Sequence, residues 1–193
     1  MKSICVYCGS ASQASRQYFL AAQRMGEILA GRGLTLVYGG GRTGLMGAVA
    51  DGALAAGGQV IGVITSGMNT PELAHTRLTR LEVTSTIHQR KARMYALADG
   101  YLALPGGYGT FDELFETLTW AQIGEHHKPV GLLNVDGYYD YLLKMLDRAV
   151  AEKFLFPEHR ASLICACEPD KLLDAMESHV YPHEAVHRWM TQE

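Results

Sequence analysis

Two charged residues stand where they can act on a small phosphorylated molecule. Glu113 directly follows a glycine-rich run, 104–112, that leads from an apolar stretch into one of helical period. Arg90 interrupts the apolar side of an earlier helical stretch, which includes Ile87 and Met94. A buried arginine without a partner is strongly destabilising. We therefore expect Arg90 to pair either with a structural carboxylate or with the anion of a substrate.

The run 104–112 has the composition of a phosphate-binding loop. Glycines let the backbone approach a ligand closely, and the start of a helix presents free N–H groups and a partial positive charge to an anion. The residues expected at the phosphate are those of the loop itself: Gly106, Gly107, Tyr108, Gly109 and Thr110. We expect the Thr110 hydroxyl to lie at the N-cap. The alternative is a capping box, in which Thr110 and Glu113 only satisfy the first turn of the helix.

The stretch after this loop has two different sides. One side is an apolar stripe for the core, made of Phe111, Leu114, Phe115 and Leu118. Another side groups Glu113 and Thr117 with Trp120. Because an exposed face seldom carries tryptophan, this side predicts a pocket or a subunit contact, and we do not expect Glu113 and Glu116 to be simply solvated.

An earlier glycine run, 39–44, satisfies G-x-G-x-x-G between an apolar stretch and a helical one. The candidate ligand-binding residues in it are Gly40, Gly41 and Gly44. A dinucleotide site also needs a carboxylate at the end of the next strand, and residues 63–66 contain none. The run therefore favours a mononucleotide or a sugar phosphate. A purely structural turn is the alternative.

Two further motifs match metal or redox patterns only formally. Cys5 and Cys8 have C-x-x-C spacing, but residues i and i+3 of a strand point to opposite faces, so we expect the cysteines to be buried free thiols. His183 and His187 belong to an H-E-x-x-H match. Too few residues follow it to supply a third zinc ligand, so we interpret it as a chance match.

Short apolar runs alternate with helical stretches along the whole chain. The predicted strands are 3–8, 34–38, 59–64, 80–84, 101–104, 129–133 and 162–166, of which 80–84 is the weakest. The predicted helices are 15–31, 44–57, 87–99, 111–123, 138–151 and 169–179. The continuously apolar run 59–64 is typical of a parallel sheet that is covered on both faces.

This order of elements predicts one α/β domain, a doubly wound parallel sheet over residues 1–180, followed by a polar tail, 181–193. Such sheets bind ligands at the carboxyl ends of their strands, where both glycine runs fall. The irregular segment 65–79 follows a strand in the same way, and we expect it to form either a pocket wall or a plain surface loop.

Composition excludes several classes of partner. The net charge is −3, and no cluster of Lys and Arg provides the basic surface that nucleic acid requires. No apolar run reaches the ~18 residues of a membrane span. The chain opens on an apolar strand without the pattern of a signal peptide, so we expect a cytoplasmic protein.

Two motifs together resemble the LOG ("Lonely Guy") family of cytokinin riboside 5′-monophosphate phosphoribohydrolases, also described as possible lysine decarboxylases. The P-G-G-x-G-T-x-x-E signature of the family stands at 105–113, and its R-K pair is Arg90 and Lys91. The resemblance also covers 8–10, 39–41, 44–47, 119–124 and 128–134. A mild departure is Phe111-Asp112, where plant members usually read Leu-Glu.

The resemblance implies a Rossmann-like homodimer that hydrolyses the N-glycosidic bond of a nucleoside 5′-monophosphate, such as AMP or a cytokinin riboside monophosphate, without a cofactor. It implies that Arg90 and Glu113 are the catalytic pair. It adds Glu72 as a substrate contact, for which the match is looser. The expected substrate-binding residues also include Gly9, Ser10, Glu116 and Lys91, and the alternative for Lys91 is a solvated charge. The competing interpretations are a pyridoxal phosphate enzyme, a metalloprotease, and a carrier that holds a nucleotide without cleaving it.

Overall fold

The structure is a computed structural model that describes residues 1–184, 186 and 191. Its centre is a sheet of seven parallel strands in the order β4-β3-β2-β1-β5-β6-β7. The strands are β1 Ser3–Tyr7, β2 Thr35–Tyr38, β3 Val60–Thr65, β4 Arg80–Thr84, β5 Gly100–Ala103, β6 Val130–Leu133 and β7 Leu163–Ala166. All seven predicted strands are confirmed to within a residue at each end.

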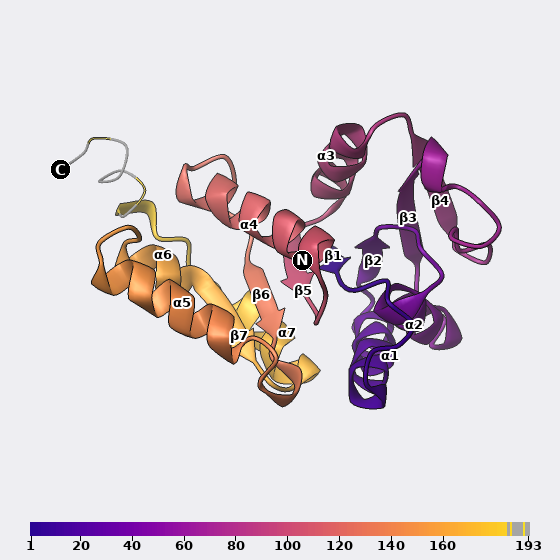
Figure 1. The fold of residues 1–193 in the computed structure, drawn as a ribbon, viewed down its shortest axis with the longest axis horizontal. Coiled ribbons are helices and arrows are strands. Elements are labelled where there is room, and N and C mark those ends of the chain that lie inside the picture. Colours follow the sequence, from indigo (N-terminus) through magenta and orange to yellow (C-terminus); the bar gives the residue numbers. More distant parts are fainter. Residues whose placement is uncertain (185, 187–190, 192–193) are drawn as a thin grey trace.

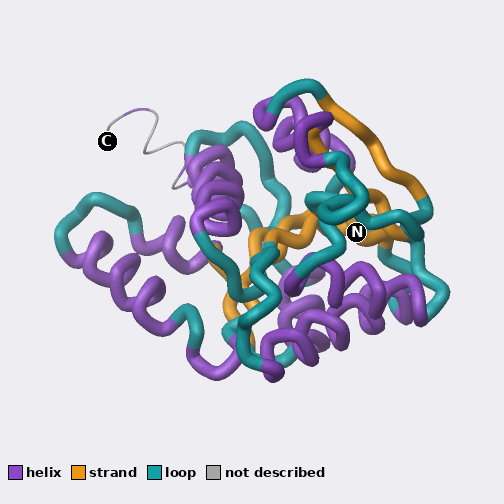
Figure 2. Tube along the Cα trace, turned by 45° about the vertical axis from the view of Figure 1, so that its right-hand side comes forward, coloured by secondary structure: helices purple, strands orange, loops and turns teal. Residues whose placement is uncertain are grey.

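Helices cover both faces of the sheet, so the protein has three layers (Figures 1 and 2). The helices on one face are α1 Arg16–Gly31, α2 Gly44–Ala55 and α7 Pro169–Glu177. Those on the other are α3 Ile87–Leu97, α4 Tyr108–Gln122 and α5 Asp140–Ala151. Short helices complete the chain: η1 Ser66–Met68, η2 Val135–Gly137 and α6 Pro157–Ser162. The α/β doubly wound fold is therefore confirmed.

The order of the strands creates a crevice beside β1. The chain proceeds outward from β1 to β4, then crosses back so that β5 pairs with the other edge of β1. Tyr7 at the end of β1 is in register with Ala103 at the end of β5. The loops that follow these two strands diverge to opposite faces, which opens a ligand-sized space between them.

The core consists of two apolar clusters, one on each face of the sheet. Cys8 belongs to the cluster under α1, α2 and α7, whereas Cys5 belongs to the cluster under α3, α4 and α5. The two thiols are therefore buried on opposite faces, as expected from their spacing. The other two cysteines were expected to be buried as well, but Cys165 and Cys167 are exposed, since Cys165 lies on the edge strand β7 and Cys167 directly follows it.

Two glycines let α1 and α2 pack at backbone distance. A Cβ on Gly26 would lie 2.1 Å from the Val49 carbonyl oxygen, and one on Gly52 would lie 2.2 Å from that of Gln23. This close packing holds α2 against α1, and the Leu45 N–H ties the start of α2 to the Gly9 carbonyl after β1.

Two local expectations are wrong. Helix α4 begins at Tyr108 with Gly107 as its N-cap, so Thr110 lies inside the first turn and forms no capping box. Tyr108 and Gly109 take helical conformation because the packing of the helix outweighs the ~1 kcal/mol penalty of a glycine. Phe115, expected in the core, is 39% exposed, whereas Thr117 is buried.

Within the described residues, no helix is long and apolar enough to cross a membrane.

Candidate active site

A cavity of about 590 Å³ lies at the carboxyl ends of the central strands. The loops after β1, β2 and β5 and the segment after β3 supply its walls, together with side chains from α1, α3 and α4. Its lining includes most of the predicted site residues: Gly9, Ser10, Gly41, Arg90, Gly106, Gly107, Tyr108, Gly109, Thr110 and Glu113. The size suits a nucleotide-sized ligand.

Arg90 reaches this cavity from α3 and is held by the backbone as well as by a carboxylate. Its Nε donates to the Val63 carbonyl at 2.8 Å and its Nη2 to the Gly39 carbonyl at 3.0 Å. Gly39 must lack a side chain for this, since a Cβ there would lie 1.9 Å from Nη2. The two carbonyls therefore fix the plane of the guanidinium, and the remaining nitrogen, Nη1, is left to face Glu113.

Glu113 lies on the second turn of α4, with Oε1 3.7 Å from Nη1 of Arg90. The side chain is only 13% exposed. Burial raises the pKa of Glu113 to about 7, and Arg90 opposes this rise. A carboxylate with this pKa changes its charge near neutral pH, which is the range in which a general base is most effective.

The loop between β5 and α4 presents backbone donors to the same cavity. Within the described part of the chain, the N–H groups of Tyr108, Gly109 and Thr110 donate to no protein acceptor. Among the described residues, the Thr110 hydroxyl likewise has no protein hydrogen-bond partner, although the residue is 3% exposed. Free donors at the start of a helix favour an anion, so this loop can hold a phosphate.

The first glycine run has a different arrangement from the one expected. The N–H groups of Leu45 and Met46, at the start of α2, both donate to the Gly9 carbonyl. Gly44 has a φ of 61°, and a Cβ there would lie 2.4 Å from the carbonyl carbon of Ser10. Gly40 and Gly44 do not line the cavity. This run therefore shapes the cavity through Gly39, Gly41 and Thr43, and its helix start is partly occupied by the protein itself.

Four other residues singled out from the sequence lie outside the lining of the cavity: Glu72, Lys91, Glu116 and Trp120. Lys91 pairs with Asp112 at 2.8 Å and with Glu116 at 3.0 Å, so it joins α3 to α4 behind Glu113. Glu72 is exposed, and its pKa is lowered mainly by its own backbone N–H and by the Thr70 hydroxyl. Trp120, expected at a pocket or a subunit contact, packs edge-on against Tyr95 at 4.8 Å.

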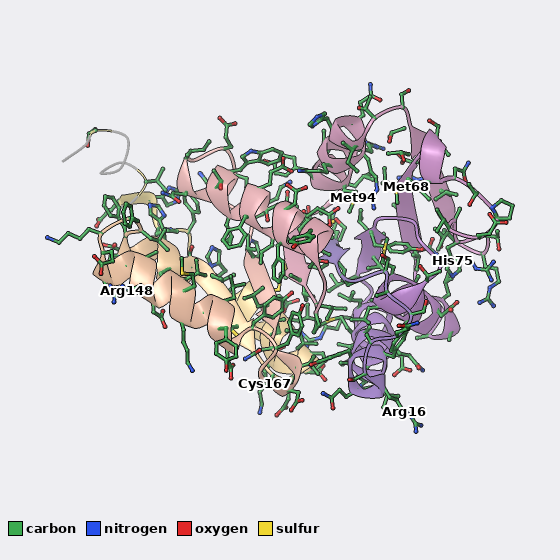
Figure 3. All side chains as sticks on the ribbon, in the orientation of Figure 1. Arg16, Met68, His75, Met94, Arg148 and Cys167 are labelled. Atoms are coloured by element: carbon green, nitrogen blue, oxygen red, sulfur yellow. The ribbon has the colours of Figure 1, made fainter. Side chains whose placement is uncertain are left out.

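Sequence reasoning missed several side chains of the lining: Tyr18, Thr43, Met46, Met68, Leu73 and Tyr138. Met68 and Leu73 belong to the segment 65–79, so the expectation that this segment forms a pocket wall is confirmed. In Figure 3, Met68 and His75 lie on one side of the molecule, far from Arg148 on α5. Nothing in the spacing of Tyr18 or Tyr138 pointed to the site, because their contacts join distant parts of the chain.

Cys8 supplies no thiolate to the cavity, and the described residues form no metal site. Cys8 lines the cavity, but burial raises the pKa of its thiol, so the thiol is protonated at neutral pH. In residues 1–184, 186 and 191, no three His, Cys, Asp or Glu side chains gather in a way that can hold a metal ion. His187 of the H-E-x-x-H match lies outside the described residues.

The fold and the cavity define a class: a doubly wound α/β protein with a buried acid–arginine pair beside a glycine-rich loop whose backbone N–H groups are free. A family model described as "possible lysine decarboxylase" matches residues 46–176. The chain is 46% identical, over its whole length and 78% of the relative, to the probable cytokinin riboside 5′-monophosphate phosphoribohydrolase LOGL5 of Oryza sativa subsp. japonica. It is 44% identical to LOG2 of Arabidopsis thaliana, a cytokinin riboside 5′-monophosphate phosphoribohydrolase, over 95% of this chain and 86% of that protein.

The chain therefore belongs to the LOG family, whose family model carries the description "possible lysine decarboxylase". Among solved structures, the molybdenum cofactor binding protein of Rippkaea orientalis is similar, with a TM-score of 0.70 and 24% identity. The alignment covers 92% of this chain and 97% of that one. This likeness shows that the two proteins share a fold.

The words "lysine decarboxylase" imply pyridoxal phosphate, which binds its enzymes through a Schiff base to a lysine. The described residues that line the cavity include no lysine. Lys91 is the lysine of the R-K pair, and two carboxylates hold its amino group behind Glu113. The residues of this cavity do not fit pyridoxal phosphate.

Proposed function

We propose that the protein hydrolyses the N-glycosidic bond of purine nucleoside 5′-monophosphates and releases the free base and ribose 5-phosphate. The observation that carries this proposal is the buried pair of Glu113 and Arg90, which faces the same cavity as the free N–H groups of 108–110. Membership of the LOG family supports the same reaction, since related members bear the name of this activity.

In the proposed reaction, the loop at 106–110 binds the 5′-phosphate and so places the ribose against Glu113. Cleavage of a glycosidic bond passes through an oxocarbenium-like state, which a nearby carboxylate stabilises. Glu113 also takes a proton from the attacking water. Arg90 acts by its charge and not by proton transfer, because a guanidinium group holds its proton firmly and is a poor acid. Water supplies the hydroxyl on C1′, and the departing base gains a proton.

The proposal extends to the substrate and the assembly. Met46, Met68 and Leu73 give the cavity an apolar wall that suits a purine ring and an apolar group on its N6 atom. Such contacts discriminate between bases by only ~1–3 kcal/mol each, so plain AMP and a prenylated analogue are both candidate substrates. We further propose a homodimer that acts in the cytoplasm, as the family resemblance implies.

The test is to incubate the purified protein with AMP and, separately, with isopentenyladenosine 5′-monophosphate. We expect equal amounts of base and ribose 5-phosphate, measured by chromatography. The ratio of the two rates separates cytokinin activation from general nucleotide salvage. If neither nucleotide is cleaved but both bind tightly, the proposal is wrong and the protein is a nucleotide carrier.

The pH dependence of this reaction should follow the charge of Glu113. Because Glu113 acts as a carboxylate and its pKa is about 7, we expect kcat/KM to fall by about tenfold per pH unit well below that pKa, and to level off above it. A profile of kcat/KM from pH 5 to 9 measures this fall, the acidic limb of the profile. Arg90 holds the pKa of Glu113 down, so in an Arg90→Gln variant the limb should move to higher pH. A limb near the ordinary glutamate pKa would contradict the assignment.

A further inference from the structure

The first three carbonyl groups of the glycine-rich run 104–112 all accept hydrogen bonds from distant parts of the chain. The Leu104 carbonyl accepts the Tyr139 hydroxyl at 2.7 Å. The Pro105 carbonyl accepts the N–H of Gly9 at 3.0 Å. The Gly106 carbonyl accepts the Tyr138 hydroxyl at 2.5 Å. Three successive peptide groups are thus held in place before the free donors of α4 begin.

The last of these contacts determines the direction of a donor in the loop. The Gly106 carbonyl and the Gly107 N–H belong to one trans peptide group, so they point in opposite directions. Tyr138 therefore fixes the Gly107 N–H when it holds the Gly106 carbonyl. No side chain fits at position 106, since a Cβ there would lie 2.1 Å from the Thr110 hydroxyl oxygen and 2.8 Å from the Gly9 nitrogen.

The turn that carries the two tyrosines is itself braced. Asp136 has a φ of 51°, a left-handed conformation that is uncommon in residues other than glycine. Gln17 of α1 donates to the Asp136 carboxylate at 2.6 Å. The Asn134 side chain accepts the Tyr139 N–H at 2.7 Å and donates to Asp140 at 2.8 Å. A conformation of this kind persists only where its surroundings enforce it, and it is often found at functional sites.

We propose that Tyr138 is a positioning residue for the phosphate subsite: its hydroxyl orients the peptide between Gly106 and Gly107, and the turn 134–140 holds Tyr138 in place for this purpose. The inference rests on the proposed function, in which the loop binds the 5′-phosphate. The Tyr138 ring lines the cavity and packs edge-on against Tyr18 of α1 at 5.7 Å. The phenol therefore joins α1, the turn and the loop at one point.

The test compares Tyr138→Phe with Tyr141→Phe, a matched control on α5 whose ring is 84% exposed. Both variants keep the ring and lose one hydroxyl. Binding of ribose 5-phosphate by calorimetry and the KM for AMP are measured on the full chain. For Tyr138→Phe, we expect both constants to rise by about three- to tenfold, the effect of losing one hydrogen bond, with a smaller change in kcat. We expect Tyr141→Phe to behave as the unsubstituted protein.

The outcomes separate this inference from the proposed function. If the unsubstituted protein binds ribose 5-phosphate but cleaves no nucleotide, a weaker Kd in Tyr138→Phe still supports the inference, while the proposed function fails. If the protein cleaves nucleotides and Tyr138→Phe only lowers the Tm, with Kd and KM unchanged, Tyr138 is merely structural and the inference is overturned. The inference is also overturned if the unsubstituted protein binds no ribose 5-phosphate.

A second variant keeps the test decisive if Tyr138→Phe does not fold. Gln17→Ala removes the exposed brace on Asp136 without changing the cavity lining. We expect it to raise the same two constants in the same direction, by less than the loss of the Tyr138 hydroxyl. Unchanged constants in a folded Gln17→Ala protein would overturn the part assigned to the turn.

Discussion

A Glu113→Gln protein is expected to bind AMP but to release base about 10²- to 10⁴-fold more slowly, the range lost with a general base. Glutamine has nearly the same shape, so the phosphate loop and the apolar wall keep their places. The glutamine amide has no negative charge to stabilise the oxocarbenium-like ribose, and it cannot take a proton from water. The measurement is a single-turnover assay of released adenine, with Glu152→Gln, an exposed substitution directly after α5, as the control.

The same variant tests the buried charge without any reference to turnover. The folded-state pKa of Glu113, about 7, exceeds its ordinary value of 4.5, so the folded protein binds the proton more tightly than the unfolded chain. Glu113 therefore costs stability as the pH rises between these values, by up to about 3 kcal/mol at pH 8. We expect the unfolding free energy of the unsubstituted protein, relative to that of Glu113→Gln, to fall over this range. A difference that is flat with pH would contradict the raised pKa.

The second large effect is expected for Arg90→Lys, which keeps the positive charge but loses the planar fork. An ammonium group has no rigid geometry that serves the Val63 and Gly39 carbonyls while a third nitrogen faces Glu113. We expect kcat/KM to fall by about 10- to 10²-fold, from the loss of charge-assisted hydrogen bonds. Steady-state kinetics with AMP measure this effect.

The matched control is Arg93→Lys on the same helix. Like Arg90, Arg93 donates two hydrogen bonds from its guanidinium group, in this case both to the Glu82 carboxylate. Unlike Arg90, it is exposed and lies outside the cavity lining. We expect its turnover to be unchanged. Near-normal turnover in Arg90→Lys would mean that the charge alone suffices, and the role of the fixed guanidinium would have to be abandoned.

Much of the fold was predictable because burial dictates the local sequence pattern. A strand covered on both faces, such as β3, must be apolar throughout, and this pattern predicted the parallel sheet. The start of α4 was misjudged because glycines were assigned to the loop. Glycine permits a helix as well as a turn, and only the packing of the helix decides between them.

The candidate site was predictable where neighbouring residues act together and not where the chain returns from a distance. Arg90 was identified as an arginine that needs a partner, but its two carbonyl acceptors leave no mark on the sequence, since every residue has a carbonyl. Tyr138 lies 32 residues from the Gly106 carbonyl that it contacts. Glu72 was assigned from resemblance alone, and its role stays a prediction.

The contact between Arg90 and Gly39 has a consequence for how this family can diverge. Any side chain on Gly39 would occupy the place of the guanidinium, with a Cβ 1.9 Å from Nη2 and 2.7 Å from the Cε atom of Met46. The effects of substitutions at positions 39 and 90 on activity are therefore not additive. Once one substitution has displaced the guanidinium, a second substitution at the other position adds little further loss. A change at either position alone disturbs this contact, so the two positions constrain each other although they lie on separate elements of the chain.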